Sequence, residues 1–298
     1  MREGLRRAVW ALTVAAVLAS SPVRGEAIRI ETRDGTRTAI LVPARPDPVP
    51  TIIVLHGAAI GAEWTMRGSG FAEAAAAHGF AAVFPDGLYR VWNDGREGGR
   101  ISRIDDVGFL RQLVAWLIGH GVADPAQVYL AGMSNGGMMT LRMLCEAAEL
   151  FAGAGTLIAN MPAGIGDGCR PKKPLPIVML NGTADPLVPY GGGGVGFAGR
   201  RGIVWSAERT AAFLAEVNGC DGPATRPLAT GAPGEVAKVV LLDWSSCSSG
   251  RPVMLYRVEG GGHQVFGRTD IFAAILGPGT RLISAPEVML ELFAGTGR

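Results

Sequence analysis

A serine enclosed by glycines is the residue whose setting points most directly to chemistry. Residues 132–136 read GMSNG, a Gly-x-Ser-x-Gly pentad with Ser134 at its centre. The apolar run QVYLAG (127–132) precedes it and a helix-like stretch follows it. A strand that turns sharply into a helix exposes its serine and needs small residues two positions away on either side. This context predicts that Ser134 is a nucleophile, although the bare pentad also fits an ordinary glycine-rich loop.

A serine hydroxyl needs a base to take its proton, and the four histidines of the chain are the candidates for that base. His78 and His120 stand at the ends of helix-like stretches, which indicates surface or cap residues. His56 follows an early apolar run, upstream of the serine. His263, in VEGGGHQVF, is downstream of it and follows a late strand. In this kind of site the acid and then the base follow the nucleophile along the chain, so His263 is predicted as the base.

Besides the serine and the histidine, such a site needs an acidic residue. It is expected just after the end of a strand, at a position between the serine and the histidine in the sequence. Asp185 comes just after the apolar run of residues 177–182 and is predicted to orient His263 and to stabilise its imidazolium form. An Asp-Pro pair also opens ordinary turns, which is the other interpretation of this residue. Asp167 and Asp243 are weaker candidates, because one precedes the strand and the other lies near the end of a strand.

Acyl transfer also needs backbone N–H groups where the tetrahedral oxyanion forms, and one such donor contributes about 3 kcal/mol. The residue after the nucleophile, Asn135, is expected to supply one. The loop LHGAAIGAEW (55–64) is expected to supply the other, from Ala58 or, as a second choice, Ala59. A helix that begins beside the serine adds the positive end of its dipole. His56 is then interpreted as a structural residue whose ring braces this loop.

The elements that must position these residues alternate along the chain. Residues 27–43 alternate around Asp34-Gly35 and predict a β-hairpin. Strands are expected over 51–57, 80–87, 127–132, 156–160, 175–182, 238–244 and 253–263, and helices over 71–79, 104–118, 138–150, 206–219 and 284–295. Such alternation predicts an α/β fold, a mostly parallel sheet with helices on both faces.

The least regular stretches are the glycine-rich residues 87–103 and 186–204. Loops of that length usually carry function or are mobile. Asp105 and Asp106 stand in the first turn of a predicted helix, where negative charge is favourable, and are interpreted as structural.

Length and charge limit the class of protein. The chain has 298 residues, 48% of them hydrophobic, and a formal net charge of +2. These values fit one globular catalytic domain over residues 28–298, and the sequence has no basic stripe of the kind that nucleic-acid proteins carry.

The N-terminus predicts a secretory signal peptide over residues 1–27. Three arginines precede an apolar run over residues 8–19, and small residues then lead to a cleavage site near Gly25–Ala27. Twelve apolar residues are short for a bilayer span, so no stable membrane anchor is expected, with a short uncleaved anchor as the alternative. An extracellular or periplasmic protein is expected.

Export makes the four cysteines informative, because an oxidising compartment favours their pairing. Three pairings are possible. The sequential one, Cys145–Cys169 with Cys220–Cys247, closes the shortest loops and is the one that we expect. No cysteine or histidine group has the spacing of metal ligands, so neither a metal nor an organic cofactor is expected.

Taken together, several stretches resemble the secreted esterases of the feruloyl and acetylxylan esterase group, which also includes polyhydroxybutyrate depolymerases. The motifs, in that family's order, are LHGAAIGAEW, FPDGLYRVWNDGR, DDVGFLRQLV, VYLAGMSNGGMMTLRMLCE, NGTADPLVPYGG and LYRVEGGGH. The match covers residues 50 to 295. It implies the α/β-hydrolase fold, a catalytic triad of Ser134, Asp185 and His263, oxyanion donors at Asn135 and Ala58, and a disulfide from the cysteine after the serine.

Substrate contacts are the least determined part of the prediction. Relatives commonly carry threonine and tryptophan after the histidine, whereas this chain has Gln264, Val265 and Phe266. Phe266 is therefore expected to line an altered wall beside the base. Trp92, in a long loop, is expected to stack on a sugar ring or aromatic acyl group, or else to be a tryptophan without special role.

The sequence thus predicts a secreted serine esterase that acts on small or polymeric carboxylic esters through an acyl-enzyme. A polyhydroxyalkanoate depolymerase or oligomer hydrolase is the main alternative, although no substrate-binding domain is evident. A serine peptidase would usually add a propeller or cap domain. An inactive binding protein would tend to have lost Ser134, Asp185 or His263.

Overall fold

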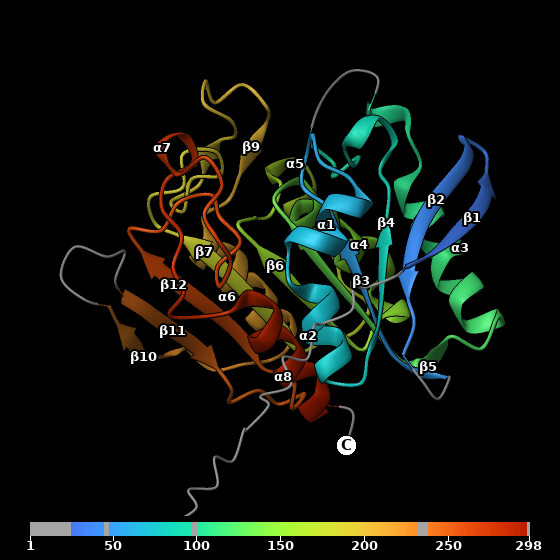
Figure 1. The fold of residues 1–298 in the computed structure, drawn as a ribbon. Helices are drawn as coiled ribbons and strands as arrows, with labels where there is room; N and C mark the ends of the chain where they lie inside the picture. The colour runs from blue at the N-terminus through green and yellow to red at the C-terminus, as the bar shows by residue number, and fades with distance from the viewer. Residues whose placement is uncertain (1–24, 45–47, 97–100, 232–237, 297–298) are drawn as a thin grey trace, which may run out of the picture.

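The computed structural model describes residues 25–44, 48–96, 101–231 and 238–296. Within them a ten-stranded sheet has the order β1-β2-β4-β3-β5-β6-β7-β12-β11-β10 (Figure 1). Its strands are β1 Glu26–Thr32, β2 Gly35–Val42, β3 Val49–Leu55, β4 Ala81–Pro85, β5 Ala123–Met133, β6 Gly153–Leu157, β7 Ile177–Gly182, β10 Ala224–Thr230, β11 Lys238–Trp244 and β12 Val253–Glu259. The strands from β4 to β12 in this order are parallel, and antiparallel pairs extend both edges.

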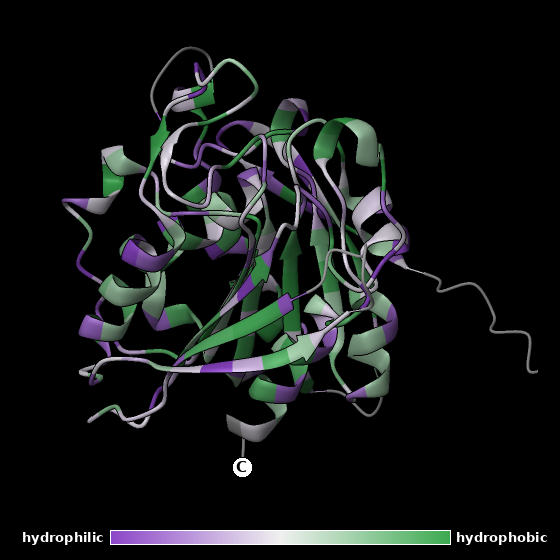
Figure 2. Cartoon of the chain, turned by 90° about the vertical axis from the view of Figure 1, so that its left-hand side faces the viewer, coloured by the Kyte–Doolittle hydropathy of each residue, from purple (hydrophilic) through white to green (hydrophobic). Residues whose placement is uncertain are grey.

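Helices cover both faces of the sheet, as the alternating pattern predicted. The described helices are α1 Ala62–Gly68, α2 Phe71–Ala77, α3 Asp106–Gly119, α4 Asn135–Ala147, α5 Ala163–Gly166, α6 Ala207–Val217, α7 Ala273–Leu276 and α8 Ala285–Thr296. One apolar core lies under α3, α4 and α6, and a second lies under α1, α2 and α8. The central strands are almost uniformly hydrophobic (Figure 2), because both of their faces are buried.

The N-terminal hairpin forms where it was expected, with Gly35 in the left-handed region at φ 98°. Its first strand begins at Glu26, and Glu26 and Ala27 pair with Leu41 and Ile40. Strand β1 thus begins within the last residues of the predicted signal peptide (1–27), whose cleavage stays a prediction. Residues 1–24 lie outside the described part of the chain. In the described part, no helix is long and apolar enough to cross a membrane.

Helix α1 and strand β10 are the longest of the described elements that were not predicted; the short α5, α7, β8 (Gly193–Gly194) and β9 (Ile203–Val204) are others. Helix α1 has only seven residues and starts after Gly61, which offers no side-chain cap. Its cap comes from a distant residue, because Asp86 Oδ1 accepts a hydrogen bond from Ala62 N at 2.8 Å. Strand β10 lies at the edge, is almost wholly exposed and contains Pro227, so it lacks the apolar signal of the inner strands.

Helix α3, which follows the first irregular stretch (87–103), begins with two acidic residues. Asp105 is the N-cap and accepts from Gly108 N at 2.9 Å, as its position suggested. Asp106 is fully buried and pairs with Arg37 at 2.7 Å, while its other oxygen accepts from Asn93 N. This buried ion pair fixes the hairpin to the start of α3.

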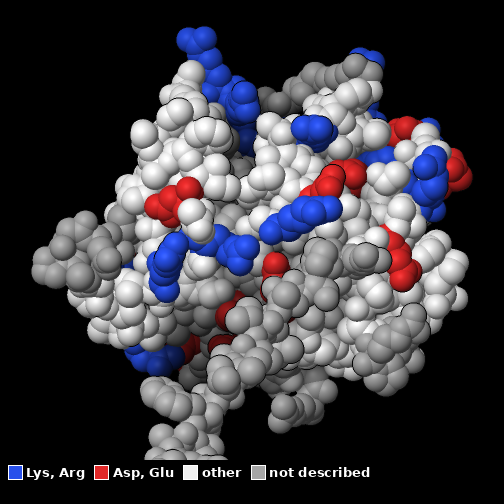
Figure 3. All heavy atoms as spheres, viewed as in Figure 1, with Lys and Arg blue, Asp and Glu red and all other residues white. Residues whose placement is uncertain are grey.

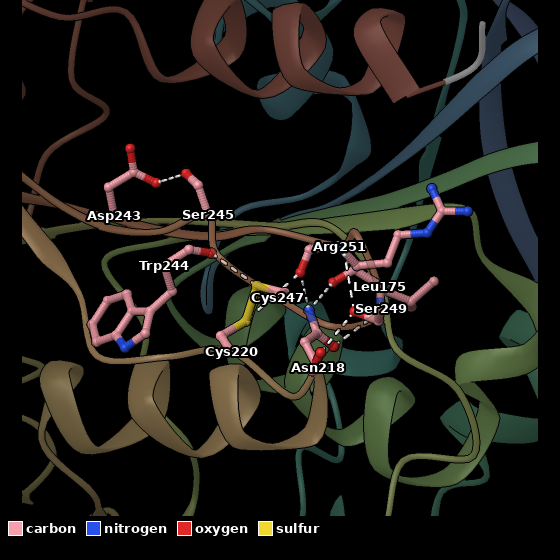
Figure 4. Close-up of a disulfide and its surroundings, with 9 residues drawn as sticks. All are labelled: Leu175, Asn218, Cys220, Asp243, Trp244, Ser245, Cys247, Ser249 and Arg251. Carbon is pink, nitrogen blue, oxygen red and sulfur yellow. Dashed lines mark hydrogen bonds between the residues drawn. A yellow bond between two sulfur atoms is a disulfide. The ribbon is translucent and has the colours of Figure 1, made fainter.

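Both expected disulfides are present. Cys145 of α4 is bonded to Cys169, and Cys220 is bonded to Cys247. Figure 4 shows the second bridge between the end of α6 and the turn that joins β11 to β12. Beside it, the Asn218 amide donates to the carbonyls of Leu175 and Arg251, both at 2.7 Å. The bridge and this amide together join three separate segments of the chain.

Candidate active site

Ser134 lies at the turn between β5 and α4, in a strained backbone conformation with φ 53° and ψ −121°. Steric constraints explain why the residues two positions before and after Ser134 are glycines. A Cβ atom at Gly132 would collide with the carbonyl of Gly136, and one at Gly136 would collide with the carbonyls of Leu55 and His56. The serine is thereby held at the N-terminus of α4, at the carboxyl edge of the parallel strands.

Two further side chains meet Ser134 at this edge. His263 follows β12 and Asp185 follows β7, and these strands are parallel neighbours whose ends lie together. His263 Nε2 is 3.0 Å from Ser134 Oγ, and His263 Nδ1 is 2.7 Å from Asp185 Oδ2. Because a carboxylate only accepts, Nδ1 donates to Asp185 and Nε2 is left to accept from the serine hydroxyl.

Asp185 is itself held by the backbone. Its Oδ1 accepts hydrogen bonds from Leu187 N at 2.7 Å and Val188 N at 2.8 Å. Its side chain is 1% exposed and that of His263 is 9% exposed. The carboxylate therefore has a fixed orientation toward the imidazole, in a site from which most water is excluded.

The other two aspartates that were considered as the acid lie elsewhere. Asp167 is 80% exposed and pairs with Arg209 on the surface. Asp243 bonds Arg226 at 2.9 Å and the hydroxyl of Ser245, as Figure 4 shows for the serine. The geometry therefore favours Asp185 over both alternatives.

The residues expected to stabilise an oxyanion line the same cavity as Ser134 and His263. Asn135 and Ala58 both contribute to its surface. Ala59 lines it as well, but its N–H already donates to the Arg90 carbonyl at 2.9 Å. Of the two alanines considered, the geometry therefore leaves Ala58 as the candidate donor.

His56 is a structural residue. It is fully buried; its Nδ1 donates to the Gly57 carbonyl at 2.7 Å, and its Nε2 accepts from Gly87 N at 2.9 Å. Burial lowers the pKa of this imidazole below its ordinary value, which keeps the ring neutral. The ring thus joins the loops that follow β3 and β4, as predicted for the first of them.

Two predicted substrate contacts are wrong. Trp92 is 1% exposed, stacks on Phe109 and donates its indole N–H to the His56 carbonyl at 3.0 Å. Phe266 is completely buried, in the apolar cluster that contains Met289 and Phe293 of α8. Both aromatic rings belong to the core and present no face to a ligand.

The cavity beside Ser134 has a volume of about 420 Å³. Part of its wall comes from the irregular stretch 186–204, which was expected to carry function. Apolar and aromatic side chains dominate the lining, namely Ile60, Trp64, Met138, Ile158, Leu187, Val188, Val195, Val265, Ile271, Phe272 and Leu276. Of these residues, Val265 was noted in the sequence beside His263, and Leu187, Val188 and Val195 lie in the irregular stretch 186–204.

Gln264 shapes the wall next to the base. Its amide nitrogen donates to the carbonyls of Ile271 and Gly277, and its oxygen accepts from Ile271 N. These bonds hold the segment that carries Phe272 and Leu276 over the cavity. Within the described ranges, no group of three or more His, Cys, Asp or Glu side chains could hold a metal ion.

No family model matches the chain. It is 31% identical over 271 residues to a protein of Nocardia uniformis subsp. tsuyamanensis named "Putative esterase NocK", and the match covers 85% of this chain and 76% of NocK. The chain belongs to the α/β-hydrolase esterase family. This esterase is also 30% identical over 221 residues to feruloyl esterase B of Piromyces equi, a match that covers 72% of this chain and 39% of that relative.

The solved structures agree on the fold. The acetyl xylan esterase of Aspergillus awamori superposes with a TM-score of 0.56 at 15% identity, and the match covers 84% of this esterase and 97% of the Aspergillus chain. The family inferred from the sequence motifs and the α/β-hydrolase fold are thus confirmed. The protein is an ester-hydrolysing enzyme.

Proposed function

We propose that this esterase is a serine esterase that hydrolyses carboxylic esters through an acyl-enzyme. One observation carries the proposal, the continuous chain of hydrogen bonds from Asp185 through His263 to Ser134, at 2.7 and 3.0 Å. A base within 3 Å of the serine hydroxyl, itself oriented by a buried carboxylate, is the arrangement that activates a serine.

In the first half-reaction, Ser134 Oγ attacks the ester carbonyl carbon as His263 Nε2 takes the hydroxyl proton. The tetrahedral oxyanion accepts hydrogen bonds from the backbone N–H groups of Asn135 and Ala58. The bond to the alcohol oxygen then breaks, and His263 gives its proton to the departing alcohol. Asp185 keeps the imidazole in the right tautomer and stabilises its charged form.

In the second half-reaction, water replaces the alcohol. The water oxygen attacks the acyl carbon while His263 takes a proton from the water. A second tetrahedral oxyanion forms beside the same backbone N–H groups. When the bond to Ser134 Oγ breaks, the proton returns to the serine and the carboxylic acid leaves. The chain's own side chains and backbone account for every proton in this cycle.

The cavity indicates which acyl groups fit. A volume of about 420 Å³ with apolar walls accommodates an aromatic acid or a short aliphatic acid. Feruloyl-type or acetyl esters are therefore the first candidates, in line with the names of the relatives. Polyhydroxyalkanoate oligomers are the second, because Phe272 is 73% exposed where it lines the cavity and offers an apolar surface to a polyester.

The place of action that fits best is outside the cytoplasm. Two disulfides, which close loops around α4 and after α6, would persist in an oxidising compartment. The N-terminal signal pattern supports the same conclusion. Fractionation of cells that produce the full chain should place the mature protein in the periplasm or medium, and retention of the uncleaved chain in the cytoplasm would reject this part.

The catalytic proposal is tested with the purified protein and p-nitrophenyl butyrate. The variant Ser134→Ala should lose at least about 1,000-fold in kcat/KM, since both proton transfers act through that oxygen. The variant Ser249→Ala, which removes a hydroxyl beside Asn218, serves as the matched control and should keep its rate. Equal activity of the Ser134 variant would reject the proposal. Methyl ferulate, acetylated xylan and hydroxybutyrate trimer then rank the substrate classes.

A further inference from the structure

The cavity beside Ser134 contains more positive charge than neutral ester hydrolysis requires. Three arginines contribute to its surface, Arg96, Arg201 and Arg268. Among the described residues that line it, there is no aspartate or glutamate. An apolar cavity that combines a nucleophile with unbalanced positive charge suits a substrate of opposite charge.

Arg96 is neutralised by its neighbour. Its Nε and its terminal nitrogen contact Asp94 at 2.9 and 2.7 Å, and only 15% of its side chain is exposed. The same guanidinium donates to the Arg201 carbonyl at 3.0 Å. Arg96 therefore acts as a support that fixes the position of Arg201.

Arg201 is held in place by its backbone. Its N–H donates to the Val195 carbonyl at 3.0 Å, and its stem lies against Gly196, which also lines the cavity. No carboxylate of the described residues pairs with its guanidinium. Cationic side chains are conspicuous at the top of Figure 3, where Figure 1 places the loop with the short strand β9, Ile203–Val204.

Arg268 reaches the cavity from the other side, three positions after the wall residue Val265. Its Nε donates to the Gly68 carbonyl at 3.2 Å, and its stem lies over Gly70 at the junction of α1 and α2. In the described part of the chain, it too has no carboxylate partner. The side chain is half-buried, and among the described residues the Gly68 carbonyl is the acceptor that its guanidinium bonds, out of five N–H donors that it carries.

We propose that Arg201 and Arg268 select esters that also carry a free carboxylate, such as half-esters of dicarboxylic acids or acetylated hydroxy acids. This inference rests on the serine-esterase proposal and specifies its substrate class. A guanidinium binds a carboxylate through two parallel hydrogen bonds, and such charged bonds are about twice as strong as neutral ones. Arg268 is half-buried and therefore less screened by water than the exposed Arg201.

The test compares pairs of esters that differ only in charge. The first pair is mono-p-nitrophenyl glutarate and the corresponding glutaramate, with the charge on the acyl side. The second is 3-acetoxypropanoate and 3-acetoxypropanamide, with the charge on the alcohol side. In at least one pair, kcat/KM should be about tenfold or more higher for the carboxylate, as expected for one or two charge-assisted bonds.

Variants assign this preference to the two arginines. Arg201→Gln and Arg268→Gln should each lower the carboxylate-to-amide ratio of kcat/KM by about tenfold, and Arg268→Lys should lower it less, because the charge remains. Arg200→Gln is the matched control, since Arg200 is exposed in the same loop but does not line the cavity. It should leave the ratio unchanged. Thermal unfolding of each variant checks that the fold is intact.

The outcomes separate the two proposals. Equal or lower kcat/KM for the carboxylates in both pairs overturns the inference, as does a preference that survives in the double variant of Arg201 and Arg268. In either case, if Ser134→Ala no longer hydrolyses the ester bond of the neutral, amide-bearing substrates, that loss would still support the serine-esterase proposal. If Ser134→Ala hydrolyses the ester bond of these neutral substrates at the normal rate, the serine-esterase proposal itself fails.

Discussion

The side-chain amide of Asn135 donates a hydrogen bond to the carboxylate of Asp94 at 2.6 Å. The same amide group forms two hydrogen bonds with the backbone of Trp92. It donates to the Trp92 carbonyl at 3.0 Å, and its oxygen accepts from the Trp92 backbone N–H at 2.7 Å. The residue whose backbone N–H is proposed to stabilise the oxyanion is thus fixed to the loop after β4. Asp94 also holds Arg96, so one carboxylate connects the turn at Ser134 with the arginines that line the cavity.

Asp94 is therefore expected to be a positioning residue. In Asp94→Asn an amide replaces the carboxylate that accepts hydrogen bonds from Asn135 and Arg96, so Asn135 should lose its fixed orientation and kcat should fall about tenfold, with a smaller change in KM. Steady-state kinetics with p-nitrophenyl butyrate measure the changes in kcat and KM separately, and thermal unfolding checks the fold. The exposed Asp221→Asn is the control. An unchanged kcat would show that the amide network does not serve catalysis.

The acid can be identified by comparing three aspartates. Asp185→Asn should lower kcat by about 1,000-fold or more, because an amide donor facing Nδ1 favours the wrong histidine tautomer. Asp167→Asn and Asp243→Asn, at the two other positions that the sequence offered, should stay within about twofold of the wild type. Rate measurements at saturating substrate decide between them. A strong loss in either control with a mild loss at Asp185 would assign the acid elsewhere.

The histidine position and the serine turn were predictable because their causes are local or topological. A side chain at Gly132 would collide with the Gly136 carbonyl in the same turn, and one at Gly136 would collide with the carbonyls of Leu55 and His56 at the end of the neighbouring strand β3. Asp185 and His263 meet because parallel strands end at the same edge of a sheet. The chain order of the apolar runs was sufficient to predict that edge.

The roles of Trp92 and Arg268 were not predictable, because they depend on segments distant in the chain. Trp92 sits in an irregular loop that looked exposed, yet His56 and Phe109 bury its ring. Arg268 faces the cavity because its stem rests on the α1–α2 junction, and α1 itself depends on a cap from Asp86. No local pattern of residue types records such contacts.

The buried His56 predicts a dependence of stability on pH. Because burial lowers its pKa in the folded state, the unfolded chain binds the proton more readily below the ordinary histidine value of about 6.5. Stability should thus be constant above that pH and fall below it, by at most about 1.4 kcal/mol per pH unit from this proton. Urea unfolding between pH 8 and pH 5 measures the slope.

His56→Gln should be less stable at pH 8 but should show a shallower loss toward pH 5, since the titrating group is gone. His78→Gln is the control, because His78 is partly exposed and pairs with Glu287 at 2.9 Å. It should not make the slope shallower. An equally steep loss in the His56 variant would assign the acid sensitivity to other groups.

Direct capture of the nucleophile is the most decisive measurement. The purified protein is treated with a fluorophosphonate, which transfers its phosphonyl group to an activated serine, and peptide mass spectrometry then locates the adduct. The account predicts one adduct, on Ser134, which is absent from Ser134→Ala and strongly reduced in His263→Ala. Full labelling of another residue, or equal labelling of the Ser134 variant, would contradict it.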